Sequence, residues 1–452
     1  MKASQVRSSP RQGAFSFIAS LVSALAAGQA SAAGMTIYEI GTADVGLASA
    51  GYNARAQDAS TVLANPAGMT RLEGTQFLAA GQLAYGWTKF SIGSRTSPEL
   101  GSDNGGNAFG WSGWAPGGGG FFSYSVSPEL KLGFALTSDL GGVLDYDNSW
   151  VGRYYVQKTE ILGISLLPSI AYKVTDKLSL GASVNVVYGI YENKVAINVP
   201  DALRPVATTP GQRSSGDGQL KLYDTTWSAG VNLGVLYEID AGTRLGLIWN
   251  SQVNLNFSSP AQFSSVGALG PILASKGLLN STVNVGIKVP QQAMGSVFAQ
   301  VNPRWALLGS VGWQQWSKFG QIQLGLDDAL TSRSLTTNIP FKDTWHFAAG
   351  AQYRVNDPWL INFGIAYDTG FQSGNVSPLL PTNAQWRFGV GAEHQASKTL
   401  KWGFAAEYMY GGSLDVNIQS QTPVVAGGRG DLVGSYNSTG ALFLAAYGSW
   451  KF

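Results

Sequence analysis

Asn356-Asp357-Pro358-Trp359-Leu360-Ile361-Asn362-Phe363-Gly364 indicates the fold of this chain, because it joins a tight polar turn directly to a strand of alternating side chains. This arrangement of a turn followed by a strand occurs six times along the 452 residues, with longer loops between the occurrences. Short turns that alternate with long loops and join amphipathic strands are typical of a transmembrane β-barrel. The six turns are Ser127–Glu129, Thr175–Lys177, Asp240–Gly242, Asn302–Pro303, Asn356–Pro358 and Ser397–Thr399.

The composition excludes several classes of protein. Charged residues make up 12% of the chain, aromatic residues another 12%, and 58 residues are glycine. No stretch of about 20 apolar residues follows the N-terminal region, which argues against a helical membrane protein. The net charge of +2 indicates no polyanionic partner such as nucleic acid. Without cysteine there is no disulfide framework and no thiolate metal site, and we expect no cofactor or metal.

The two ends of the chain both indicate the bacterial outer membrane. Residues 1–32 read as a secretory signal peptide, with a basic start, an apolar middle at Ala14–Ala27 and a small-residue cleavage site at Ala30–Ala32. A membrane anchor is the alternative, but the apolar run is short for that role. The chain finishes on Phe452, and a last strand that ends on an aromatic residue is typical of outer-membrane barrels. We therefore expect the barrel assembly machinery to recognise Phe452.

Fourteen alternating segments can be recognised, and most reach the roughly 9–11 residues that a strand needs to cross the bilayer. An even strand number places both termini on the side of the short turns, which is the periplasm. The strands must close, since an open edge in lipid leaves backbone groups unpaired. The predicted fold is all-β, a 14-stranded antiparallel transmembrane β-barrel. The segments are 75–92, 117–126, 131–140, 158–174, 178–197, 221–239, 243–257, 281–301, 304–324, 342–355, 359–368, 385–396, 400–411 and 439–452.

Side-chain parity assigns the two faces of each strand. In the ninth segment Trp305, Leu307 and Val311 fall on one side, which we expect to face lipid, and Leu308 falls on the other. The same alternation turns four ionisable residues inward, namely His346, Arg387, Glu393 and Glu407. The predicted lining is small, sparsely charged and partly apolar, which suits greasy solutes better than ions.

About forty residues precede the first strand. A disordered periplasmic tail is one interpretation, but residues 33–73 have regular apolar content and a helix-capping Asp58 or Ser60. Fourteen strands also enclose a lumen that is too wide for wall side chains to fill. We therefore predict three parts: a signal peptide at 1–32, a hatch folded inside the barrel at 33–73, and the barrel at 74–452.

Several stretches resemble the FadL/TodX family of outer-membrane transporters of long-chain fatty acids and aromatic hydrocarbons. The resemblance covers essentially the whole mature chain. It implies passive uptake of a hydrophobic small molecule, most simply a long-chain fatty acid, with an aromatic hydrocarbon as the alternative. It also implies a hatch, lateral exit at an inward kink of the third strand, outer-membrane lipid and lipopolysaccharide as surroundings, and a monomer. The matching stretches are Gly46–Gly51, Asp58-Ala59, Asn65–Ala67, Leu132–Ser138, Val289-Pro290, Asn302–Ala306 and Trp313–Ser317.

The resemblance assigns roles residue by residue. Asn65, Pro66 and Ala67 match the hatch motif, which packs at the kink, and Gly141 with Gly142 falls at that kink. Glycine there tolerates strand distortion and close approach of another segment, although a simple loop start is the alternative. An outer loop would carry a ligand groove, although mere loop packing is equally open, and its residues are Phe263, Val266, Leu269, Ile272 and Leu273.

The sequence departs from the family at the deep pocket that holds a carboxylate. An expected arginine near Tyr188–Lys194 is replaced, which leaves Lys194, and Lys318 is a second candidate. Simple solvation of either lysine is the alternative. His346 and Arg387, both inward, complete the pocket candidates. If neither lysine reaches the pocket, the sequence favours an uncharged ligand such as an aromatic hydrocarbon.

The rival functions for such a barrel are those of an enzyme and of a general porin or adhesin. A barrel-type lipid hydrolase needs a histidine with a matching serine or carboxylate, and the two histidines, His346 and His394, have no such set in the sequence. We therefore expect no catalytic residues and no enzymatic activity. A general porin would lack a forty-residue plug, and an adhesin would carry larger outer loops.

Overall fold

The computed structural model describes residues 38, 40–204, 216–275, 277–319, 321–327, 334–338, 341–420 and 423–452. For residues 321–327 and 334–338 it describes the backbone only. The predicted signal peptide at 1–32 and the start of the hatch lie outside these residues. Both that cleavage site and the boundaries of the three parts stay predictions.

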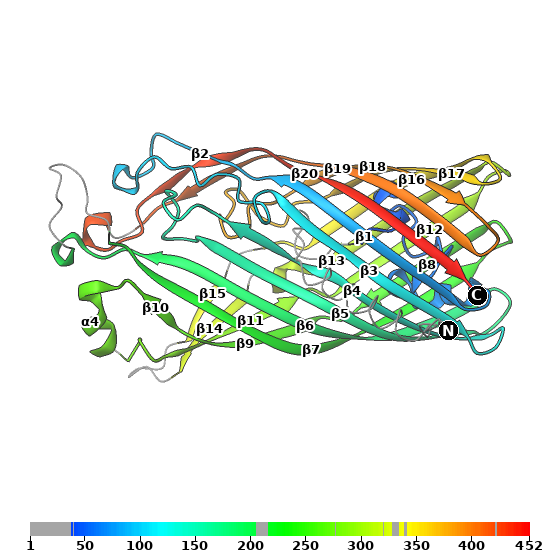
Figure 1. Ribbon diagram of the computed structural model, residues 1–452, viewed down its shortest axis with the longest axis horizontal. Helices are drawn as coiled ribbons and strands as arrows, with labels where there is room; N and C mark the ends of the chain where they lie inside the picture. The colour runs from blue at the N-terminus through cyan, green and yellow to red at the C-terminus, as the bar shows by residue number, and fades with distance from the viewer. Residues whose placement is uncertain are drawn as a thin grey trace, which may run out of the picture.

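Fourteen antiparallel strands in the described residues form a closed ring, as the sequence predicts (Figure 1). The first and last strands close it, with a register that runs from Gln76 opposite Lys451 to Trp87 opposite Gly440. In ring order the strands are β1 (Gln76–Trp87), β3 (Trp114–Ser125), β4 (Leu130–Asp145), β5 (Lys158–Lys173), β6 (Leu178–Ile197), β7 (Gly218–Glu238), β8 (Thr243–Asn250), β12 (Gln292–Gln300), β13 (Trp305–Gln314), β16 (Thr344–Asn356), β17 (Trp359–Asp368), β18 (Gln385–Gln395), β19 (Leu400–Ile418) and β20 (Leu432–Lys451).

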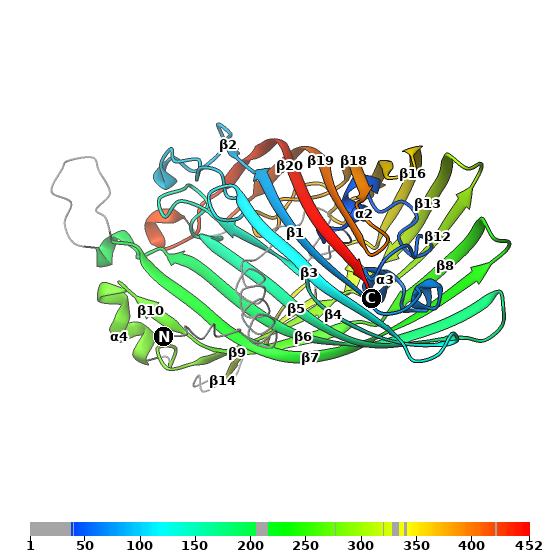
Figure 2. The same ribbon diagram turned by 45° about the vertical axis from the view of Figure 1, so that its right-hand side comes forward.

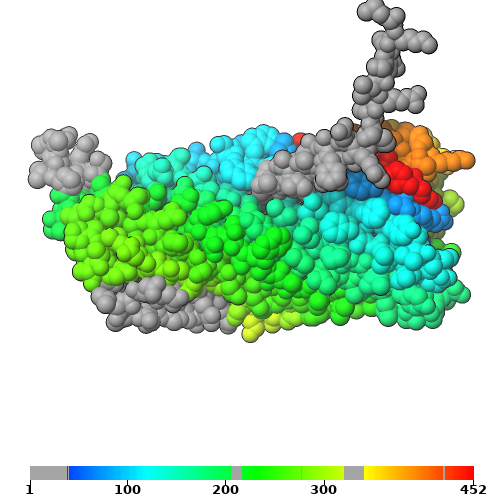
Figure 3. All heavy atoms as spheres, turned by 60° about the horizontal axis from the view of Figure 1, so that its bottom comes forward, coloured from blue at the N-terminus to red at the C-terminus, as the bar shows by residue number. Residues whose placement is uncertain are grey.

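The predicted alternation of faces is confirmed by burial. On β13, Leu307 is 52% exposed and Val311 49%, whereas Ala306 and Leu308 are buried. Apolar side chains that point outward in this way form the surface that a barrel presents to lipid. Figure 3 shows the outside of the barrel in a space-filling view, in which the green middle part of the chain forms a closely packed outer surface. Among the described residues, no helix is both long and apolar enough to span a membrane.

Three expected strands are interrupted, which the sequence did not indicate. Segments 243–257, 281–301 and 304–324 each break in the middle. Their parts away from the short turns join β15 in a separate four-stranded sheet, in the order β15-β14-β11-β9, which we call the outer sheet. Pro290 lies at one break, where its missing N–H ends the ladder. The strands of this outer sheet are β9 (Val253–Pro260), β11 (Thr282–Val289), β14 (Gln321–Asp327) and β15 (Ser334–Asn338).

The outer sheet has one apolar and one polar face. On β9, Val253, Leu255 and Phe257 are buried, while Asn254 and Asn256 are exposed. The outward face of this sheet is therefore polar, unlike the apolar outward face of the barrel wall. Its apolar face is turned inward, over the lumen.

Short elements complete the end of the barrel that lies opposite the C-terminus, which we call the outer end (Figure 1). The rings of Tyr146 and Trp150 stack there with centroids 4.0 Å apart, and the Tyr146 and Tyr436 hydroxyls are 2.7 Å apart. The remaining elements are β2 (Phe90–Ile92), β10 (Gln262–Ser264), η2 (Pro98–Leu100), η3 (Asp201–Leu203), η4 (Gly267–Leu269), α4 (Gly270–Ser275), η5 (Trp316–Lys318) and η6 (Val424–Ala426).

Residues 40–72 of the hatch lie inside the barrel, near the end that carries the C-terminus (Figure 2). They contain α2 (Ala43–Leu47), α3 (Thr61–Ala64) and η1 (Pro66–Arg71). The hatch backbone rests directly on inward glycines of the wall. A Cβ added at Gly364 would lie 1.9 Å from the Leu47 carbonyl oxygen, and one at Gly246 would lie 2.0 Å from the Asn53 oxygen. These glycines are required because no side chain fits between hatch and wall.

Candidate functional site

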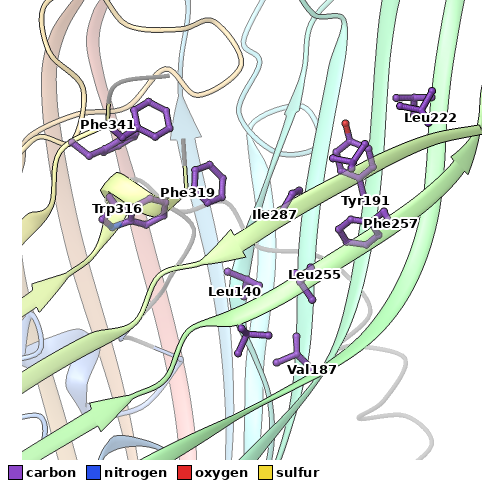
Figure 4. Close-up of a cluster of buried hydrophobic side chains, with 14 of the residues drawn as sticks. Leu140, Val187, Tyr191, Leu222, Leu255, Phe257, Ile287, Trp316, Phe319 and Phe341 are labelled. Atoms are coloured by element: carbon purple, nitrogen blue, oxygen red, sulfur yellow. The ribbon is translucent and has the colours of Figure 1, made fainter. Parts of the chain in front are cut away.

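The lumen on the outer side of the hatch is lined by a group of buried apolar side chains, which we call the lumen cluster (Figure 4). The inner faces of β6, β9 and β11 supply most of it, and the rings of Tyr191 and Phe257 stack with centroids 5.3 Å apart. Such an environment accepts the apolar body of a ligand and offers little to an ion. The cluster consists of Leu140, Val187, Tyr191, Leu222, Val253, Leu255, Phe257, Ala261, Val283, Val285, Ile287, Trp316, Phe319, Phe341 and Phe371.

The wall is irregular beside this cluster. Pairing between β3 and β4 covers Gly119 to Ser125 and stops at the pair Gly119–Thr137. Beyond it, no ladder pair among the described residues joins Trp114–Gly118 of β3 to Ser138–Gly142 of β4. We call this stretch the β3–β4 break. It ends towards the outside where the loop at Ala108–Gly110 bonds to β4.

A β-bulge causes the break. The pairing of β4 with β5 shifts register between Thr137 and Leu140, so that both of these residues point inward although they are three positions apart. Gly141 follows with a φ of +143°, and a Cβ there would lie 2.4 Å from the Ile161 carbonyl oxygen. The distortion expected at Gly141 and Gly142 is therefore present, and it begins just before them.

The hatch motif lies elsewhere than expected. The Asn65 side chain caps η1 by accepting a hydrogen bond from the Ala67 N–H at 3.1 Å, and it donates to the Val235 carbonyl of β7 at 3.0 Å. Pro66 and Ala67 rest on Gly181 of β6. The expectation that Asn65, Pro66 and Ala67 pack at the third-strand kink is wrong. They rest on β6 and β7, where Gly181 and Gly234 lack a side chain and so admit the hatch.

A buried ion network fixes the hatch to the wall. In the hatch, Arg55 binds Asp44 at 3.1 Å and Asp58 at 3.0 Å. Lys401 of β19 lies 3.4 Å from Asp58 and 2.8 Å from Glu393 of β18. Burial alone would raise the pKa of Asp58, but Arg55 and Lys401 outweigh it and hold that pKa below its usual range. Arg55 and Lys401 were not predicted from the sequence. The signal for Arg55 was a charged triad, with Asp44 and Asp58, within an otherwise apolar segment, and the inward parity of Lys401 on its strand was the signal for that residue.

Two of the pocket candidates meet on the inner wall. His346 Nδ1 lies 2.7 Å from Asp368 Oδ1, and Arg387 Nε donates to Asp368 Oδ2 at 2.8 Å. A second carboxylate, Glu407, lies 3.7 Å from Arg387. Both candidates point inward as predicted, but the charge of Arg387 is already balanced by two carboxylates.

The two lysines are placed differently from each other. Tyr191 faces the lumen cluster, and Lys194 lies three positions further along the same regular strand, hence on the opposite side. It lies 3.5 Å from Glu192, which also binds Lys158 and Lys221. This corrects the expectation that Lys194 lines the pocket. Lys318 is exposed and precedes Phe319 of the lumen cluster.

The outer-loop candidates form a partly exposed group. Phe263 packs against the lumen cluster, Val266 lies next to Gly218, and Ile272 is 42% exposed. Leu269 ends η4, and Leu273 lies in the short helix α4. Within the described ranges, no three acidic or histidine side chains gather as a metal site.

Comparison with known proteins gives consistent matches. The family described as "Outer membrane protein transport protein (OMPP1/FadL/TodX)" matches residues 23–449. The chain is 26% identical to the long-chain fatty acid transport protein of Escherichia coli K12, over 87% of this chain and 91% of that protein. It is 27% identical to outer membrane protein P1 of Haemophilus influenzae, over 86% and 88%.

Two solved structures share the fold. A FadL homologue of Pseudomonas aeruginosa superposes with a TM-score of 0.77 at 21% identity, over 93% of this chain and 100% of that one. The toluene transporter TbuX of Ralstonia pickettii gives a TM-score of 0.62 at 18% identity, over 92% and 99%.

Proposed function

Because this chain belongs to the OMPP1/FadL/TodX family of outer-membrane transport proteins, we propose that it takes up hydrophobic small molecules by passive diffusion, long-chain fatty acids above all. The relatives are transporters, which argues for transport over lipid hydrolysis. A hatch that is buried inside the barrel argues against a general porin. Periplasmic termini, recognition of Phe452 during assembly, contact with lipopolysaccharide and a monomeric state are parts of the same proposal.

One residue carries the proposed route. Leu140 belongs to the lumen cluster and also ends the bulge at which β4 leaves β3. A solute held in the cluster therefore already lies beside the β3–β4 break. The hatch closes the straight path to the periplasm, so the solute leaves sideways into the membrane. On the outer side, Phe263 connects the cluster to the outer-loop group, which we propose as the entrance.

Aromatic hydrocarbons are the second candidate class of substrate. Arg387 and His346 share Asp368, and Lys194 points away from the lumen cluster. Of the four basic candidates, that leaves Lys318 to meet a carboxylate. A weakly charged lining serves an uncharged aromatic as well as it serves a fatty acid.

The absence of cysteine allows a clean test of the exit route. In a Gly142→Cys variant, the only thiol lies on the lumen side of the break, and a bulky methanethiosulfonate reagent attached there would block the passage. Uptake of radiolabelled oleate and toluene would be measured in cells that lack their own transporter. We expect labelling to lower uptake to near the vector level, and dithiothreitol to restore it.

The matched control is Gly295→Cys on β12. Position 295 faces outward on another part of the wall, and a Cβ there meets nothing within 4 Å. The same label should leave its uptake unchanged. If fully labelled Gly142→Cys imports at the wild-type rate, the sideways route is wrong. Gly141 is a poorer site for substitution, since its φ and the nearby Ile161 oxygen would distort the strand.

A further inference from the structure

Asp139 is an acidic residue in the bulge at the β3–β4 break. Its Oδ1 accepts a hydrogen bond from the Ser165 hydroxyl at 2.5 Å. Ser165 is 1% exposed and lies on the inward face of β5, so the Asp139 carboxyl lies on the lumen side. The next residue, Leu140, belongs to the lumen cluster. Any solute that moves from the cluster to the break passes this carboxyl group.

The surroundings of Asp139 differ from those of the other acids inside the barrel. Five buried acids each have a basic partner at 2.8–3.7 Å: Asp44, Asp58, Asp368, Glu393 and Glu407. Asp139 has its hydrogen bond from Ser165, and no basic side chain within the described ranges forms an ion pair with it. The break therefore contains an acidic group and offers no positive charge.

This arrangement disfavours an anionic solute whatever the state of Asp139. If Asp139 is ionised, a second carboxylate beside it is repelled, since two such groups in a desolvated site do not both stay charged. If Asp139 is neutral, a passing anion loses its water without gaining a cation, which is costly.

We infer that solutes cross the β3–β4 break uncharged, and that Asp139 imposes this requirement. The inference rests on the proposed exit route. A hydrocarbon meets the requirement directly. A fatty acid meets it by carrying its own proton, taken from water at the outer loops, and no proton transfer to or from Asp139 is involved.

The test compares two solutes of equal chain length, radiolabelled 1-dodecanol and dodecane-1-sulfonate, of which the second is always charged. Initial uptake is measured in cells that lack their own transporter and carry wild type or a variant. Wild type should import the alcohol well above the vector and the sulfonate near the vector level. Asp139→Lys should raise sulfonate uptake at least about tenfold while alcohol uptake stays within about twofold, because the lysine supplies the missing cation.

Two further variants separate charge from other effects. Asp139→Asn removes the acid without adding a cation, so its sulfonate uptake should lie below that of Asp139→Lys. Asp176→Lys makes the same charge change in a fully exposed periplasmic turn and should leave both uptakes unchanged. Barrel assembly is checked by the gel shift on heating. If Asp139→Lys fails to assemble, Ser165→Lys brings a cation to the same place from β5 and should have the same effect.

The possible results point to different conclusions. The inference is overturned if wild type imports the sulfonate as fast as the alcohol. It is equally overturned if an assembled Asp139→Lys or Ser165→Lys leaves the ratio of the two uptakes unchanged. Alcohol uptake equal to that of the vector would instead refute the proposed function on which the inference depends.

Discussion

Replacing Lys401 with methionine should loosen the hatch. In the docked state Lys401 Nζ lies 2.8 Å from Glu393 and 3.4 Å from Asp58, whose side chains are 2% and 1% exposed. Methionine keeps the length of the side chain and removes the charge. Glu393 then retains its hydrogen bond from Asn362, and Asp58 retains Arg55. Both carboxylates nevertheless stay buried with less positive charge nearby.

The expected magnitude follows from this geometry. Removing one partner of a buried ion pair costs about 3–5 kcal/mol. Because Lys401 is 18% exposed and Asp58 keeps a second partner, we take the lower end, about 3 kcal/mol. At 1.36 kcal/mol per factor of ten, the undocked population should rise about 100-fold.

The assay is single-channel conductance in a planar bilayer during a urea titration. A hatch that leaves the lumen turns the barrel into a wide pore, so the urea concentration at which large conductance begins reports on docking. We expect this midpoint to fall clearly for Lys401→Met. The matched control Lys398→Met removes the same charge from an exposed turn three residues away and should leave the midpoint unchanged.

A double variant tests the physical reason. Adding Glu393→Gln to Lys401→Met removes the second charge as well, and most of the lost stability should return, since removing both partners of a pair costs far less than removing one. A midpoint for Lys401→Met equal to that of wild type would refute the reasoning. So would a double variant that is no better than the single one.

Two further predictions concern the same docking. Gly364→Val should open the pore without urea while the barrel still assembles, because the added Cβ would lie 1.9 Å from the Leu47 oxygen; Gly309→Val, whose nearest neighbour would be 3.5 Å away, is the control for conductance and heat-shifted mobility. The pKa of Asp58 is lowered on docking, so its stabilising effect is complete above about pH 4 and declines as the pH falls below that value. The difference in urea midpoint between wild type and Asp58→Asn should therefore be smaller at pH 3 than at pH 7, and an unchanged difference would contradict this assignment.

The barrel could be predicted from local patterns in the sequence. Neighbouring side chains of a strand point to opposite faces, so a short stretch such as Trp305–Trp313 reveals which face is apolar without knowledge of its partners. The turns predict the number of strands. The sheet must close into a ring, because the backbone groups at an open edge would stay unpaired in lipid. The same alternation of side chains correctly predicted that His346 and Arg387 point inward.

The register between strands and the contacts between distant segments could not be predicted in this way and are seen only in the three-dimensional structure. One extra residue between Thr137 and Leu140 reverses parity and separates β4 from β3, and it is visible only against the pairing with β5. Asn65 contacts β7 at a residue 170 positions away in the sequence, and Lys401 contacts Asp58 across 343 positions. No periodic pattern encodes such contacts, because they depend on how the hatch fits the completed wall.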